Sequence, residues 1–245
     1  MIVFHGETDI GRRRQLNEDA ILAANGLFIV CDGMGGHKAG EVASKLATDV
    51  IASFISRSGE DPELTWPYGF DPTITYDANR LRTAIKLANR IVFRKSASEE
   101  DYSGMGTTVV AMLVSPDRGE MTYANVGDSR IYRINAGAIR QLTRDDSWVN
   151  LVPGSDTAAM KNVLTKALGA REEVDFDVVT MALTPGDVLL LCSDGLTNML
   201  SDDDILRAVL GYPGDLGAAC RHLVDAANEE GGRDNISVLL VRYER

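Results

Sequence analysis

Apolar residues recur at helical spacing in two stretches of the first half of the chain. From Lys38 to Ile55 they return every three or four positions, which places them on one face of a long amphipathic helix. A second stripe of the same period runs from Leu81 to Val92. Residues 58–75 between the two stripes contain three prolines and several acids, so they are predicted to form a loop.

Much of the remaining chain consists of short apolar runs or of alternating apolar and polar residues, both typical of strands. We expect strands at Ile2–His5, Ala20–Ala24, Leu27–Asp32, Thr107–Val114, Met121–Val126, Arg130–Ile134, Ile139–Leu142, Val174–Met181, Asp187–Ser193 and Ile236–Val241. Asn25-Gly26 predicts a type I′ turn between the second and third of these. Ser201 followed by Asp204 marks a helix start, and another helical face covers Leu216–Ala227. Strands interleaved with helix pairs, rather than in strict βαβ alternation, predict an α+β sandwich.

Composition narrows the class of protein. A chain of 245 residues with 44% hydrophobic content suits one large domain or two small ones, and its prolines and glycines do not divide it. We therefore expect a single domain over residues 1–245. Acidic residues outnumber basic ones 36 to 25, and the net charge of -11 argues against nucleic acid or an anionic membrane as a partner. No apolar run approaches the roughly 18 residues that span a bilayer.

The three cysteines, Cys31, Cys192 and Cys220, are odd in number, lie in apolar surroundings and lack CxxC spacing. This pattern predicts neither a disulfide framework nor a zinc knuckle. We interpret them as buried thiols in a reducing cytosol. The first residues contain no long apolar stretch, which also fits a cytoplasmic protein.

Carboxylates at the ends of buried strands, each next to Gly or Asn, are the main candidate chemistry. They occur in Asp32-Gly33, Gly127-Asp128, Asp194-Gly195 and Asp234-Asn235, and Glu18 and Asp19 precede the hairpin that leads to Asp32. On its own, the turn after Asp32 could equally be an ordinary strand-to-helix turn. Taken together the acids offer only hard oxygen ligands, which suit Mg²⁺ or Mn²⁺ better than Zn²⁺.

Two hard cations held close together suit the transfer of a phosphoryl group to water. Asp32 is the natural candidate to bridge them. Arg12, Arg13 and Arg14 form a basic run that could be a solvated surface, but the guanidinium of Arg14 could also hold two phosphate oxygens.

Six short motifs, in this order along the chain, resemble the metal-dependent protein phosphatases of type 2C, the PPM family, and particularly their bacterial branch. They are Arg14-x-x-Asn17-Glu18-Asp19, Asp32-Gly33-Met34-Gly35-Gly36-His37, Gly106-Thr107-Thr108, Gly127-Asp128-Ser129-Arg130, Ser193-Asp194-Gly195 and Gly232-Arg233-Asp234-Asn235. The resemblance covers essentially the whole chain. It implies a four-layer α-β-β-α sandwich, in which two central antiparallel sheets are flanked by helix pairs, with a dinuclear Mn²⁺ or Mg²⁺ centre at one end.

Carried over position by position, the resemblance also implies a role for each site residue. Asp32 would bridge the two ions. Asp194 and Asp234 would complete one ion's shell, and Glu18 with the carbonyl of Gly33 would complete the other's. Asp19 would orient bound water, Arg14 would hold the substrate phosphate, and Asp128 with Asp194 would bind a third ion found in bacterial relatives.

The chain departs from the family pattern in three places. Met34 stands where eukaryotic relatives have a histidine thought to protonate the leaving group. The general acid is therefore unassigned, and His37 is a candidate that also fits an ordinary helix-start position. Asp145-Asp146-Ser147 replaces the usual Asp-His-Ser, and residues 148–161 form a short version of the family's flap. Substrate preference is expected to differ accordingly.

Other phosphate chemistries fit the sequence less well. Asp175 and Asp177 match the pattern of aspartate-nucleophile phosphatases, but they alternate with apolar residues as the polar face of a strand would. No cysteine is followed by an arginine at the spacing of a cysteine-dependent phosphatase, because the residue six positions beyond Cys220 is Ala226. The glycine loop is not ordered as a nucleotide-binding P-loop.

We therefore expect a monomeric serine/threonine phosphatase that acts on phosphoserine and phosphothreonine in substrates of a Ser/Thr kinase. A water bridging two ions would attack phosphorus, without a phosphoenzyme. Two alternatives remain open at this stage: a non-catalytic phosphopeptide-binding module, and a hydrolase of small phosphate esters.

Overall fold

Two antiparallel sheets stacked face to face form the centre of the protein. The computed structural model describes residues 1–36, 39–61, 64–147 and 163–244. One sheet has the strand order β1 (Ile2–Asp9), β11 (Ile236–Tyr243), β10 (Val188–Cys192), β7 (Arg130–Asn135) and β8 (Ala138–Gln141). The other has the order β2 (Asp19–Ala24), β3 (Leu27–Met34), β5 (Val109–Ser115), β6 (Glu120–Val126) and β9 (Val178–Ala182), and β4 (Gly106–Thr107) pairs with the end of β3.

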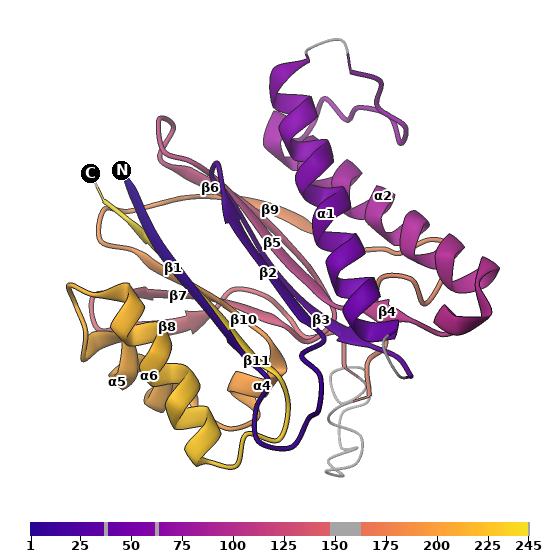
Figure 1. Cartoon of the computed structure of the whole chain (residues 1–245). Helices are drawn as coiled ribbons and strands as arrows, with labels where there is room; N and C mark the ends of the chain where they lie inside the picture. Colours follow the sequence, from indigo (N-terminus) through magenta and orange to yellow (C-terminus); the bar gives the residue numbers. More distant parts are fainter. Residues whose placement is uncertain (37–38, 62–63, 148–162, 245) are drawn as a thin grey trace.

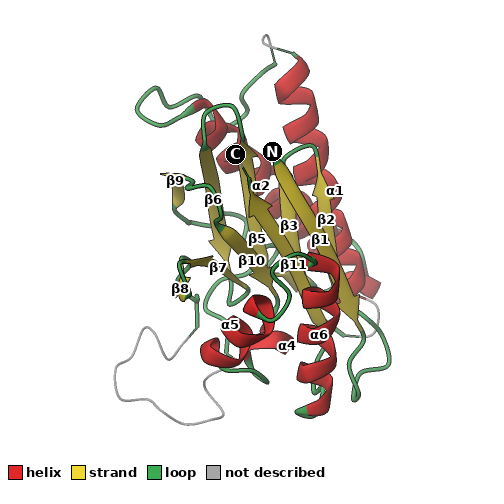
Figure 2. Cartoon of the chain, turned by 90° about the vertical axis from the view of Figure 1, so that its left-hand side faces the viewer, coloured by secondary structure: helices red, strands yellow, loops and turns green. Residues whose placement is uncertain are grey.

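Helices cover both outer faces, as Figures 1 and 2 show. The long helices α1 (Ala39–Glu60) and α2 (Tyr76–Ser98) lie on the sheet that contains β3, and α5 (Asp202–Leu210) and α6 (Leu216–Glu229) lie on the sheet that contains β11. Two short elements, η1 (Glu100–Tyr102) and α4 (Asp194–Thr197), follow α2 and β10. The predicted four-layer α-β-β-α sandwich is confirmed.

Strand β3 shows why this sequence gives a layered core. Ile29 and Cys31 face the helix layer, whereas Phe28 and Val30 point between the two sheets. All four side chains are fully buried. A strand covered on both faces must be apolar at every position, which is why Leu27 to Cys31 lacks alternation.

Several local predictions are confirmed. Asn25 and Gly26 have φ values of 52° and 79°, as a type I′ turn requires. Ser201 and Asp204 form a capping box at the start of α5. The three cysteines are buried and unpaired with one another. No helix in the described part of the chain has both the length and the apolarity to cross a membrane.

Most predicted strands differ from the structure by one or two residues at an end, and the predicted strand Thr107–Val114 is divided into β4 and β5. Two others differ by four residues at one end. β1 continues to Asp9 instead of ending at His5, because its polar second half pairs residue by residue with β11 and Thr8 Oγ1 lies 2.8 Å from Ser237 Oγ. β9 begins at Val178 instead of Val174. Val174 and Phe176 are partly buried against the core cluster that includes the apolar face of α2, whereas Asp175 and Asp177 are exposed. The alternation of apolar and acidic residues here therefore reflects burial without strand pairing.

Candidate active site

The predicted ligand residues come from four segments whose ends meet at one end of the sandwich (lower end in Figure 1). Glu18 and Asp19 stand at the start of β2, and Asp32 and Gly33 near the end of β3. Asp194 follows β10, and Asp234 precedes β11. Antiparallel pairing brings the end of β3 beside the start of β2 and the end of β10 beside the start of β11. The stacking of the two sheets then brings the two pairs of ends together.

Asp32 lies at the centre of the group. It stands directly opposite Asp19 in the pairing of β2 with β3. Its N–H donates to Thr108 Oγ1 over 3.0 Å, and its carbonyl accepts from Thr107 Oγ1 over 2.8 Å. Burial, followed by the negative charges of Asp19, Asp194, Asp234 and Asp128, raises the pKa of Asp32 well above its usual value. The carboxylates are therefore close enough to repel one another.

Asp19 is oriented by a hydroxyl group. Ser193 Oγ donates to Asp19 Oδ2 over 2.8 Å, and the same Oγ accepts from the N–H of Ser237 over 3.0 Å. Burial raises the pKa of Asp19 to about 7, and the charges of Asp194 and Asp234 act in the same direction. The hydrogen bond from Ser193 Oγ therefore fixes the orientation of the Asp19 carboxylate.

Glu18 and Gly33 are held together by close backbone packing. Gly33 N–H donates to the carbonyl of Glu18 over 3.1 Å. A Cβ at Gly33 would lie 2.1 Å from the carbonyl oxygen of Gly40 and 2.5 Å from that of Glu18, so only glycine fits. A Cβ at Gly40 would in turn lie 2.5 Å from Glu18 Oε1. Burial raises the pKa of Glu18.

Arg14 reaches the same group of acids from the loop before β2. Its Nη2 donates to Asp234 Oδ2 over 2.7 Å. This hydrogen bond is the main reason that the pKa of Arg14 is raised, and the charges of Glu18 and Asp32 add to it. The guanidinium therefore stands at the edge of the carboxylate group.

The carboxylate group fits divalent cations. Glu18 Oε1, Asp19 Oδ1 and Asp194 Oδ1 are buried and have no hydrogen-bond partner among the described residues. Such atoms are costly to bury unless a proton or a cation compensates them. No three His, Cys, Asp or Glu side chains of the described segments already surround one point in a metal-holding arrangement. The fit thus rests on the donor type and on these orphaned oxygens.

Asp128 lies beside Asp194, on the loop after β6. Burial, followed by the charges of Asp194 and Asp145, raises the pKa of Asp128 to about 7. The neighbouring residue Gly127 is tied to Asp146: its N–H donates to Asp146 Oδ2 over 3.2 Å, and its carbonyl accepts from Asp146 N–H over 2.9 Å. Asp146 also pairs with Lys166 over 3.2 Å. The departure at Asp146 therefore links the loop of Asp128 to the segment that follows residue 162.

Other predicted residues lie outside the site or outside the described residues. Met34 packs against Gly106, where an added Cβ would lie 2.8 Å from Met34 Cε. Asp175 and Asp177 are exposed, as expected for the polar face of an amphipathic segment. His37 and the predicted flap at residues 148–161 are outside the described residues.

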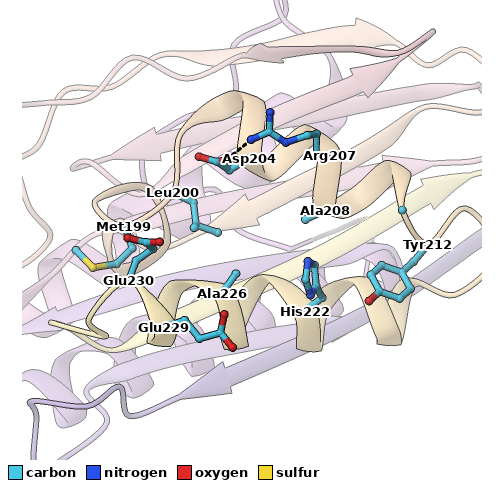
Figure 3. A pocket seen from close by; sticks show the side chains of 11 residues that line it. Met199, Leu200, Asp204, Arg207, Ala208, Tyr212, His222, Ala226, Glu229 and Glu230 are labelled. Atoms are coloured by element: carbon cyan, nitrogen blue, oxygen red, sulfur yellow. Dashed lines mark hydrogen bonds and ion pairs between the residues drawn. The ribbon is translucent and has the colours of Figure 1, made fainter.

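Two grooves flank the carboxylate group without including it. One, of about 670 Å³, lies between α5 and α6 and is lined by residues such as Leu200, Arg207 and His222 (Figure 3). The other, of about 650 Å³, is lined on one side by Asp145 and Asp146 and on another by Lys166. None of the predicted metal ligands lines either groove.

Sequence reasoning missed the hydrogen-bonding residues that hold the acids in place. Ser193 and Asn235 stood inside recognised motifs but received no role. Thr108, whose Oγ1 accepts from Asp32 N–H, is itself 2.7 Å from Ser129 Oγ. The available signal was the type of these residues: a small polar side chain at a buried strand end has to find a partner.

Comparison with known proteins places the chain in a family. The sequence pattern of protein phosphatase 2C matches residues 9–236. The chain belongs to the protein phosphatase 2C family. It is therefore a serine/threonine protein phosphatase of the bacterial PPM type, as the sequence motifs predicted.

Relatives match the chain over nearly its whole length. The serine/threonine phosphatase Stp of Listeria monocytogenes is 37% identical over 259 residues, which covers 97% of this chain and 94% of the relative. The crystal structure of Stp1 from Staphylococcus aureus has a TM-score of 0.84 at 34% identity and covers 100% of this chain and 96% of its own. The catalytic domain of the phosphatase PstP, solved in complex with two manganese ions, has a TM-score of 0.83 at 30% identity and covers 100% and 99%.

Proposed function

We propose that this protein phosphatase 2C member removes phosphate from phosphoserine and phosphothreonine in proteins with the help of two divalent cations, Mn²⁺ or Mg²⁺. The observation that carries the proposal is the convergence of Asp19, Asp32, Asp194 and Asp234, from four chain segments, into one group. In this group Asp19 Oδ1 and Asp194 Oδ1 are buried and have no hydrogen-bond partner among the described residues. The two manganese ions of the PstP structure support the same metal number.

The ligand assignment is part of this proposal. Asp32 is placed to be shared by both cations because it is surrounded by the other acids. Asp194 and Asp234 would hold one cation, and Glu18 and the carbonyl of Gly33 would hold the other. When bound, the cations would supply an activated water and positive charge that offsets the phosphate oxygens. A third cation at Asp128 and Asp194 belongs to the same proposal.

The chain's own residues orient the reaction. Asp19, held by Ser193 Oγ, accepts a hydrogen bond from the attacking water and fixes its direction. Arg14 exchanges its contact with Asp234 for the substrate phosphate and brings it to the carboxylate end. Burial of the acids keeps bulk water from competing for these contacts.

Phosphate release from a phosphothreonine peptide tests the proposal. The purified chain should be active with Mn²⁺ and inactive after EDTA treatment, and added Mn²⁺ should restore activity. Turnover in EDTA at the full rate would overturn the metal mechanism. Comparing the peptide with a small aryl phosphate separates a protein phosphatase from a general esterase.

Three broader expectations belong to the proposal as well. Residues 1–245 form a single domain, the protein acts as a monomer, and its substrates are cytosolic phosphoproteins. Sedimentation at working concentration tests the second of these.

A further inference from the structure

Asn235 makes more contacts with the ligand-bearing segments than any predicted role explains. Asn235 is only 4% exposed. Its Oδ1 accepts from the N–H of Glu18 over 2.8 Å. Its Nδ2 donates to the carbonyls of Ile10 over 3.0 Å and Leu16 over 2.9 Å. The single amide therefore satisfies three backbone groups of a segment more than 200 positions away in sequence.

The three partners demand an amide at this position. A primary amide offers one acceptor oxygen and two N–H donors, which matches one backbone N–H and two backbone carbonyls. An aspartate would keep the acceptor for Glu18 but would turn an oxygen toward the carbonyls of Ile10 and Leu16. An alanine would leave three backbone groups without their partner, which is costly at a buried site.

The anchored carbonyls belong to the two ends of the loop that carries Arg14. Ile10 lies just after β1, Leu16 lies two residues after Arg14, and Glu18 comes two residues later. Because the Asn235 side chain binds both ends of this loop, it fixes the backbone position from which the Arg14 side chain extends. The same amide holds the backbone of Glu18 where β2 begins.

The backbone of Asn235 contacts the other two ligand segments. Its N–H donates to Asp234 Oδ1 over 2.9 Å, which orients the carboxylate that pairs with Arg14. Its carbonyl oxygen would lie 2.0 Å from a Cβ at Gly195, so the turn that carries Asp194 is packed directly against it. Ser193 Oγ also lies 3.4 Å from this carbonyl.

We propose that Asn235 is a positioning residue that holds the segments of Glu18, Asp194 and Asp234 in a common register and sets the place of Arg14. The inference rests on the proposed metal centre. It predicts that loss of the amide weakens cation binding and substrate binding together, because one side chain fixes both a ligand and the phosphate arm.

The test uses Asn235→Asp and Asn235→Ala with Asn79→Asp as a matched control. Asn79 is also a buried asparagine whose side-chain amide is hydrogen-bonded to the backbone. Its Oδ1 accepts from Asp71 N–H over 2.8 Å, and its Nδ2 donates to the carbonyls of Asp71 and Thr75. Asn79 lies in the first turn of α2. In Figure 1 this N-terminal end of α2 is at the opposite end of the sandwich from the carboxylate group. Both substitutions to Asp remove the two hydrogen bonds that the buried amide donates to backbone carbonyls. At position 79 the new carboxylate also lies next to Arg82, whose Nη2 donates to Asn79 Oδ1 over 3.2 Å.

Three measurements on the full chain distinguish a positioning role of Asn235 from a role in stability alone. Calorimetric titration of the metal-free proteins with Mn²⁺ should show binding weakened roughly tenfold to a hundredfold in the Asn235 variants and unchanged in Asn79→Asp. Amide hydrogen exchange without metal should be faster at Glu18 in Asn235→Ala, because its N–H loses the acceptor Oδ1. It should be slower in Asn235→Asp than in Asn235→Ala, because Asp keeps an acceptor oxygen, and it should be unchanged in Asn79→Asp. The KM for a phosphothreonine peptide should rise in the Asn235 variants even at saturating Mn²⁺.

Each outcome decides the inference. Wild-type Mn²⁺ affinity in Asn235→Ala would overturn it, as would an equal loss of affinity in Asn79→Asp. If neither Asn235 variant folds by circular dichroism, the residue serves stability and the positioning role is wrong. Absence of Mn²⁺ binding to the wild-type chain would instead refute the proposed metal centre on which the inference rests.

Discussion

Arg14 and Asp234 lie 220 positions apart in sequence, yet Arg14 Nη2 donates to Asp234 Oδ2 over 2.7 Å. The pair is partly exposed, with side-chain exposures of 49% and 29%. An exposed ion pair of this kind adds little to stability. Its role is to hold the Arg14 guanidinium beside the acids and within reach of an incoming phosphate.

Arg14→Ala should mainly raise the KM for a phosphothreonine peptide. Loss of a charge-assisted contact to phosphate costs about 1.5–3 kcal/mol, which corresponds to roughly a tenfold to hundredfold increase. The turnover number kcat should change much less, because the proposed attacking water does not depend on Arg14. Steady-state kinetics at saturating Mn²⁺ measure both parameters. An unchanged KM would refute the role of Arg14.

Asp32→Ala and Asp234→Ala should abolish turnover while leaving the fold intact. Removing a proposed ligand should cost more than the roughly hundredfold that loss of a supporting group gives. Circular dichroism checks the fold and phosphate release checks the activity. The matched control is Asp177→Ala, an exposed acid outside the group. Inactivity of a folded Asp177→Ala protein would revive the aspartate-nucleophile mechanism.

Much of the fold and of the acid group followed from the sequence because the signals were local. Helical periodicity located α1, and the continuous apolar run before Asp32 located β3. The pairing of β1 beyond His5 was not predictable, since it depends on which distant strand lies alongside. For the same reason the contact of Asn235 with the loop of Arg14 could not be read from either segment alone.

Gly33→Ala should weaken Mn²⁺ binding and lower the melting temperature. Its Cβ would collide with the backbone carbonyl oxygens of Gly40 and Glu18, at 2.1 and 2.5 Å. Backbone cannot move aside as a flexible side chain can, so the end of β3 must shift away from Glu18. Calorimetric titration with Mn²⁺ and a thermal melt measure the two effects.

Gly36→Ala provides the control for this substitution. It lies three residues further along the same turn, and apart from its chain neighbours no atom of the described residues lies within 4 Å of its added Cβ. We expect near-normal Mn²⁺ affinity and stability. Equal behaviour of the two variants would show that the tight packing at Gly33 is not what positions its carbonyl.

Asp128→Asn should stabilise the metal-free protein increasingly as the pH rises. Burial raises the pKa of Asp128 from 3.8 to about 7, so the folded state binds this proton more tightly than the unfolded state does. The resulting stability is fully present below about pH 4 and is lost as the pH rises through 7. Asparagine does not titrate, so the melting temperature of the variant minus that of the wild type should grow between pH 5 and 8, by about 2–4 °C for each kcal/mol. Thermal melts in EDTA at several pH values measure this difference, and a difference that stays constant would contradict the raised pKa.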